Sequence, residues 1–118
     1  MENTNRVNSL KIHMNESGET YELDYNRDSI RFAEAREFVP EDVPKFPQTK
    51  VEELWFYAFR WHHKGMSRTQ TDALLKKVGG VTPKMLERLL LLYSQAQMSN
   101  SIQDDEDLEK NASVAVEF

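Results

Sequence analysis

The adjacent histidines His62 and His63 are the side chains of this sequence best suited to metal binding or proton transfer. On a helix, neighbouring positions diverge by about 100°, so the two rings cannot readily share one ion. A helical zinc site needs histidines four residues apart with a carboxylate nearby. His13 lies far away in the sequence. We therefore expect no metal site, and we interpret the pair as the polar end of an apolar helix, where a cation suits the helix dipole.

The acidic pairs Glu41-Asp42 and Glu52-Glu53 are also neighbours in the sequence. General acid–base catalysis needs carboxylates that oppose each other across a cleft, whereas these pairs resemble a solvated linker and the first turn of a helix. The chain has no cysteine, no nucleophile-elbow serine and no glycine-rich phosphate loop. We expect neither an enzyme nor a cofactor.

Residues 67–92 outline a helix-turn-helix, since two helical segments flank a short turn that contains Gly79-Gly80. Residues 60–88 carry seven basic and two acidic side chains. The second helix is rich in leucine, however, and a helix that reads a DNA groove needs Arg, Asn, Gln or Ser near its start. A small DNA-binding regulator that uses residues 67–92 is our alternative hypothesis, and we consider nucleic acid the less favoured partner.

The N-terminal part of the chain predicts a β-hairpin. Leu10, Ile12 and Met14 alternate with polar residues, the sequence NESG follows as a turn, and ETYELDY alternates again with Tyr21, Leu23 and Tyr25 on one face. An isolated hairpin is marginally stable in water. Its apolar face must therefore pack on helices or on another chain.

Four helices are predicted after the hairpin. A short helix at about 28–38 has Asn26 or Asp28 as its N-cap, and a proline-rich extended linker follows at 39–48. A capping box that begins at Thr49 predicts a helix at about 50–63. A second box begins at Ser67 and predicts a helix that ends at the glycine pair. Thr82, followed by proline, starts the last helix, which runs to about Met98. The fold class is therefore α+β and mainly helical, with the hairpin packed on about four helices.

The stretch LWFYAFRW, residues 54–61, spreads apolar side chains over a helical arc of roughly 220°. A helix that packs on one neighbour needs about half that width, so the segment is either the central core helix or has a second face for a partner. We assign Leu54, Trp55 and Ala58 to the core. The predicted partner-binding residues are Phe56, Tyr57, Arg60 and Trp61, together with Leu91, which lies opposite the apolar face of the last helix.

The charges are unevenly distributed over the 118 residues. The formal net charge is −5, and residues 99–118 alone carry six acidic residues and one lysine. We predict one domain at 1–98 and a disordered acidic tail at 99–118. The absence of cysteine, of a secretion signal and of a long apolar run indicates a protein of the cytoplasm without a membrane span.

This order of elements resembles the small tail assembly chaperones of long-tailed bacteriophages and prophages. The resemblance covers residues 7–98 and depends on the hairpin that leads into YELDYNRDSIRFAEAREF, on EELWFYAFRWHHKG before a capped helix, and on the terminal LLLLYSQAQ. It implies binding of the hydrophobic tape-measure protein, self-association, a location in the bacterial cytoplasm and absence from the mature virion. It implies no catalytic residues.

Overall fold

The computed structural model describes residues 6–101, and it confirms an α+β, mainly helical fold. The hairpin consists of β1 (Leu10–His13) and β2 (Thr20–Leu23). The helices are α1 (Arg27–Ala35), α2 (Pro47–Tyr57), α3 (Arg68–Val78) and α4 (Pro83–Ser101), with a short 3₁₀ helix η1 (Pro40–Asp42) between the first two. The predicted tail lies largely outside the described residues, although α4 continues beyond Met98 to Ser101.

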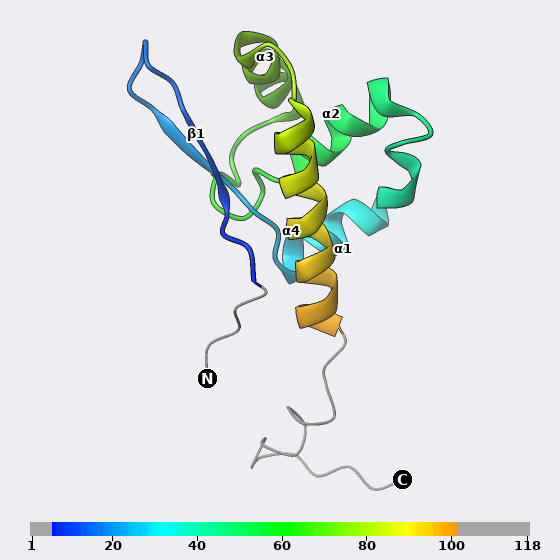
Figure 1. Ribbon diagram of the computed structural model, residues 1–118. Helices are drawn as coiled ribbons and strands as arrows, with labels where there is room; N and C mark the ends of the chain where they lie inside the picture. Colours follow the sequence, from blue (N-terminus) through cyan, green and yellow to red (C-terminus); the bar gives the residue numbers. More distant parts are fainter. Residues whose placement is uncertain (1–5, 102–118) are drawn as a thin grey trace, which may run out of the picture.

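The hairpin has the predicted apolar face. Leu10 pairs with Leu23 and Ile12 with Tyr21, so the alternating apolar residues share one face. Figure 1 shows the hairpin along one side of α4, with α1 and α2 on the other side. Leu23 and Tyr25 are buried, and the Tyr25 hydroxyl donates a 2.7 Å hydrogen bond to the carbonyl of Leu54. The end of the hairpin is therefore fixed to α2 through both apolar and polar contacts.

The core assignments within the aromatic stretch are confirmed, because Leu54, Trp55 and Ala58 are fully buried. The indole N–H of Trp55 donates a 2.8 Å hydrogen bond to the carbonyl of Thr71 on α3. The core joins these residues to side chains of the hairpin end, α1, the loop around η1, α3 and α4; its other buried members include Ile30, Ala33, Phe38, Val43, Phe59, Leu74, Leu89, Leu92, Tyr93 and Ala96.

Local capping chemistry accounts for three of the helix starts. Asn26, rather than Asp28, caps α1 through a reciprocal box with Ser29. Ser67 forms the predicted box with Gln70 at the start of α3, and the Thr82 hydroxyl accepts a 3.2 Å hydrogen bond from the amide of Met85 in the first turn of α4. Side-chain oxygens thereby satisfy amides that have no partner inside the helix.

The prediction for the linker and for the start of the second helix is wrong. The linker is not extended but contains η1 and turns, and α2 begins at Pro47. Proline suits the first helical position because its missing N–H would have no intrahelical partner there. Thr49 therefore already lies within the helix, and its hydroxyl donates a 3.4 Å hydrogen bond to the Phe46 carbonyl instead of capping.

The predicted end of this helix at His63 is also wrong, because α2 ends at Tyr57 and residues 58–62 form turns. The amide of Asp24, just after β2, donates a 3.1 Å hydrogen bond to the Ala58 carbonyl. The carbonyl of Leu54 is shared with the Tyr25 hydroxyl. The hairpin thus supplies the donor to the Ala58 carbonyl and adds a second donor to the Leu54 carbonyl, which also accepts the helical bond from the Ala58 amide.

Gly79 should be required for its backbone conformation alone. It ends α3 at φ 91°, in the left-handed region, and a Cβ there would meet no atom within 4 Å. We expect Gly79→Ala to lower the free energy of unfolding by about 1–2 kcal/mol, as measured by urea denaturation. Gly65→Ala is the matched control, since Gly65 has equally free space and no positive φ. Equal effects of the two substitutions would contradict this account.

Candidate interaction surfaces

The structure places the predicted partner-binding residues in four different environments. Tyr57 is only 3 % exposed and packs edge-on against Phe32 and Phe38 with ring centroids 5.9 and 5.2 Å away. Tyr57, which was predicted to bind a partner, is therefore covered by other side chains of the fold. Phe56 and Arg60 face α1, Trp61 projects from the turn after α2, and Leu91 lies on α4.

Phe32 of α1 lies between two arginines. The guanidinium carbons of Arg36 and Arg60 lie over its ring at 3.6 and 3.9 Å from the centroid. Because both lie over the ring, they must occupy opposite faces to avoid collision. Phe56 packs edge-on against the same ring at 6.0 Å, and Arg68 of α3 lies 6.0 Å above Phe56. Half-buried aromatic rings and cations thus alternate across α1, α2 and α3.

Sequence analysis did not identify Phe32 and Arg36 as part of this surface. Their spacing of four residues places them on one side of a helix. This spacing is the sequence feature that could have indicated an aromatic–cation pair on α1. Arg60 comes from the turn after α2 and is positioned by Asp28, whose carboxylate lies 2.8 Å from Nε of Arg60 and 3.8 Å from Nζ of Lys64. That ion pair joins the start of α1 to the turn that carries Trp61.

Trp61 is 45 % exposed, and its surroundings hold it in one place. Its indole stacks on the imidazole of His62, with ring centroids 4.5 Å apart and an interplanar angle of 19°. Nε2 of His62 lies 3.6 Å from the carboxylate of Glu22 on β2, and that carboxylate also accepts a 2.8 Å hydrogen bond from Ser9. The hydrogen bond holds the pKa of Glu22 below its ordinary value. The large apolar ring of Trp61 is thereby exposed to solvent while it stacks on His62, which in turn lies beside Glu22.

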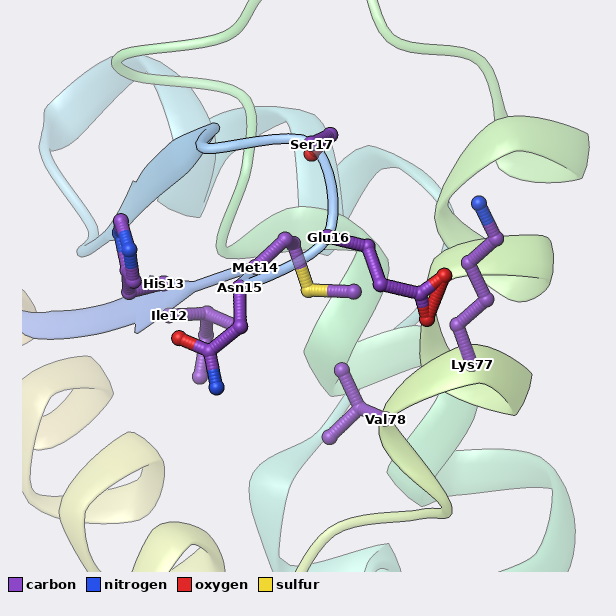
Figure 2. A pocket seen from close by; sticks show the side chains of 8 residues that line it. All are labelled: Ile12, His13, Met14, Asn15, Glu16, Ser17, Lys77 and Val78. Atoms are coloured by element: carbon purple, nitrogen blue, oxygen red, sulfur yellow. The ribbon is translucent and has the colours of Figure 1, made fainter.

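A second surface lies along β1. Leu91 is 47 % exposed and lines a hollow of about 560 Å³ between the start of β1 and the first turns of α4, together with Val7, Leu10, Met85, Lys84 and Arg88. A hollow of about 400 Å³ lies between the hairpin tip and the end of α3. Figure 2 shows the side chains of Met14 and Val78 close together in its lining, with Glu16 extending toward Lys77. Both hollows are lined by apolar and charged side chains.

The outer edge of β1 borders these hollows. The amide of Glu22 donates to His63 and that of Met14 to Glu19, so the hydrogen-bonded pairs of the hairpin are Leu10–Leu23 and Ile12–Tyr21. The amides of Lys11 and His13 consequently point away from β2. Within residues 6–101 they have no hydrogen-bond acceptor. An edge of this kind can pair with an additional strand.

The described part of the chain contains neither a group of metal ligands nor a membrane-spanning helix. In residues 6–101 no three His, Asp or Glu side chains are grouped so as to hold a metal ion. None of the helices in that range has the length and apolarity needed to cross a lipid bilayer. Around Trp61, two carboxylates make contacts that support the fold: Asp28 with Arg60, and Glu22 with Ser9.

Comparison with known proteins gives one match. No curated protein and no solved structure matches this chain. A family model described as "Domain of unknown function (DUF5055)" matches residues 2–118. This match includes the hairpin, all four helices and the segment after α4. The chain therefore belongs to the DUF5055 family.

Proposed function

We propose that this protein is a tail-assembly-chaperone-like protein that binds and solubilises the tape-measure protein of a long-tailed phage during tail assembly. The observation that carries the proposal is the exposed indole of Trp61, held by stacking on His62 at 4.5 Å. A large aromatic ring held in place loses little conformational entropy when a partner covers it, and such residues dominate binding energies.

The alternating aromatic and cationic side chains across α1 and α2 extend this surface. Phe32 and Phe56 provide apolar area, and Arg36 and Arg60 provide a charged rim. An apolar centre with a polar rim is typical of a protein–protein interface. A tape-measure helix with one apolar stripe matches this arrangement, and the arginines favour acidic residues beside that stripe.

Self-association is the second element of the proposal. The open edge of β1 and the hollow beside Leu91 supply backbone donors and apolar area for a second copy of the chain. Such a contact leaves the Trp61 surface free, because Leu91 packs beside β1 whereas Arg60 and Phe56 pack on α1. The protein can then coat a long partner as an oligomer.

In this proposal the protein acts in the cytoplasm of the bacterial host and is not retained in the mature virion. It has no catalytic activity. Polar side chains that often act in catalysis have structural partners here. Ser29 and Ser67 take part in capping boxes, Ser9 donates a hydrogen bond to Glu22, and His63 accepts one from the backbone of β2.

DNA binding by residues 67–92 is the alternative, and the packing favours it less. In a helix-turn-helix the two helices pack on each other and the second one is presented to the groove. Here α3 packs chiefly on α2, whereas α4 packs on α1, α2 and β1. Arg68 is also engaged by Asp72 at 3.0 Å and Glu52 at 3.4 Å.

We expect at most weak, nonspecific DNA binding. The exposed side chains of the first turns of α4 include only Lys84 as a cation, beside Glu87 and Leu91. Titration of labelled duplexes at physiological salt should give no preference for any sequence. A nanomolar dissociation constant with more than about a thousandfold preference over random DNA would replace the chaperone proposal with the regulator hypothesis.

A binding experiment tests the proposed function. The purified protein is mixed with helical fragments of the tape-measure protein from the same genome, and complex formation is followed by size-exclusion chromatography with light scattering. We expect a stable complex with an amphipathic fragment and none with a polar helix of equal length and charge. Failure to bind any tape-measure fragment would contradict the proposal.

A further inference from the structure

His63 connects two parts of the chain that are far apart in sequence. Its Nε2 atom accepts a 2.9 Å hydrogen bond from the backbone N–H of Glu22 on β2. A ring nitrogen that accepts a hydrogen bond carries no proton, so this contact requires a neutral imidazole with its proton on Nδ1. The geometry thus specifies both the charge and the tautomer of His63.

The ring lies in a largely aromatic environment. It packs edge-on against Tyr21 with ring centroids 5.3 Å apart, and it is tilted against Phe59 with ring centroids 6.1 Å apart. The titratable groups that face it are Tyr21 and Glu22 of β2 and His62 of its own turn, while Lys11 of β1 acts on the Glu22 carboxylate. Burial, and then His62, hold the pKa of His63 below its ordinary value, against the opposing effect of Glu22.

Protonation is incompatible with the observed contact. An imidazolium has N–H groups at both nitrogens, so Nε2–H would point at the Glu22 N–H, donor against donor. The ring must then turn away, and its contacts with Tyr21 and Phe59 change with it. The Glu22 amide loses its acceptor on the outer edge of β2.

We propose that His63 is a pH-sensitive clasp: its neutral ring holds β2 on the turn that carries Trp61, and its protonation opens this contact and loosens the Trp61 surface. The turn is short, since Trp61 and His62 directly precede His63 and the His63 amide donates a 2.8 Å hydrogen bond to the Phe59 carbonyl. A rotation of His63 therefore changes the position of the stacked Trp61–His62 pair. Acidification should weaken partner binding at this surface, and only that consequence rests on the proposed function.

The sign of the pH effect follows from the direction of the shift. The unfolded chain binds a proton at the ordinary histidine pKa of about 6.5, and the folded chain binds it only at lower pH. The stabilisation from the clasp is thus fully present above that value and declines as the pH falls below it. The carboxylates of Glu22 and Asp24 have ordinary pKa values of 4.5 and 3.8. Burial raises the pKa of Asp24, and its protonation in the fold therefore acts in the opposite direction to that of His63.

Amide exchange of the full-length protein tests the clasp without any partner. Exchange rates of the Glu22 and Leu23 amides are measured by NMR between about pH 7.5 and pH 5 and divided by the intrinsic rate at each pH. We expect protection of the Glu22 amide to fall about tenfold or more, while Leu23, which pairs with Leu10, retains its protection. Unchanged Glu22 protection over this range would overturn the proposal.

Two variants separate His63 from its neighbour. In His63→Gln a side-chain oxygen can accept the Glu22 N–H and does not titrate, so Glu22 protection should no longer depend on pH. His62→Gln leaves the clasp in place, so the pH-dependent loss of Glu22 protection should persist, displaced to higher pH because His62 no longer lowers the pKa of His63. A pH-dependent loss that persists in His63→Gln would assign the effect to another group. The wild-type titration decides the question even if a variant fails to fold.

Discussion

Trp55→Ala is expected to unfold the domain or to lower its free energy of unfolding by about 3–5 kcal/mol. The indole is fully buried and packs on Phe59 with ring centroids 5.1 Å apart. Truncation leaves a large cavity, and it also removes the donor to the buried Thr71 carbonyl. Small domains are stable by about 5–15 kcal/mol, so urea denaturation should show a large loss or no folded baseline.

Trp55→Phe is the matched control for the cavity. The phenyl ring fills most of the space but cannot donate to Thr71, so the loss should be about 1–3 kcal/mol, which is the cost of an unsatisfied buried polar group. If Trp55→Ala retained nearly the whole wild-type stability, α2 would not be the centre of the core, and the assignment of the aromatic stretch to packing would be wrong.

Trp61→Ala is expected to weaken tape-measure binding by about 1–3 kcal/mol. The loss of fold stability should stay below about 1 kcal/mol, because nearly half of the side chain is exposed and its stacking partner is His62. The measurement is paired: isothermal titration with a tape-measure fragment, and urea denaturation of the same preparation.

Phe46→Ala is the matched control for exposed aromatic area. Phe46 is 58 % exposed and precedes the first residue of α2, whereas Trp61 follows the end of that helix. Eleven helical residues separate the two sites by roughly 16 Å. Equal losses of binding for the two variants would indicate nonspecific hydrophobic attraction. A stability loss for Trp61→Ala as large as that for Trp55→Ala would place Trp61 in the core.

The sequence contained most of the information about the helix starts and little about where the second helix ends. Ser67 and Thr82 act through side-chain hydrogen bonds within three residues, so their effect is visible in a local pattern. The end of α2 depends on Asp24 and Tyr25, which lie more than 25 residues earlier in the chain and donate hydrogen bonds to the carbonyls of Ala58 and Leu54. No local pattern reveals such contacts.

Long-range contacts also determine where the predicted partner-binding residues lie, and the local sequence pattern could not reveal them. A helical projection that continued to residue 63 placed Trp61 beside Tyr57 at one margin of α2. Because the helix ends at Tyr57, the projection does not apply to Trp61, which is exposed on a turn instead. Tyr57 is covered by Phe32 and Phe38. The part played by α1 in this surface follows from tertiary packing.

The solubility of the tape-measure protein in co-expressing cells tests the central claim most directly. The tape-measure gene from the same genome is expressed alone, with this protein, or with its Trp61→Ala variant, and the soluble and pelleted fractions are quantified. We predict that the wild-type chain moves the tape-measure protein into the soluble fraction and that Trp61→Ala does so far less. A tape-measure protein that stays insoluble with the wild-type chain, or that the variant solubilises equally well, would contradict the account.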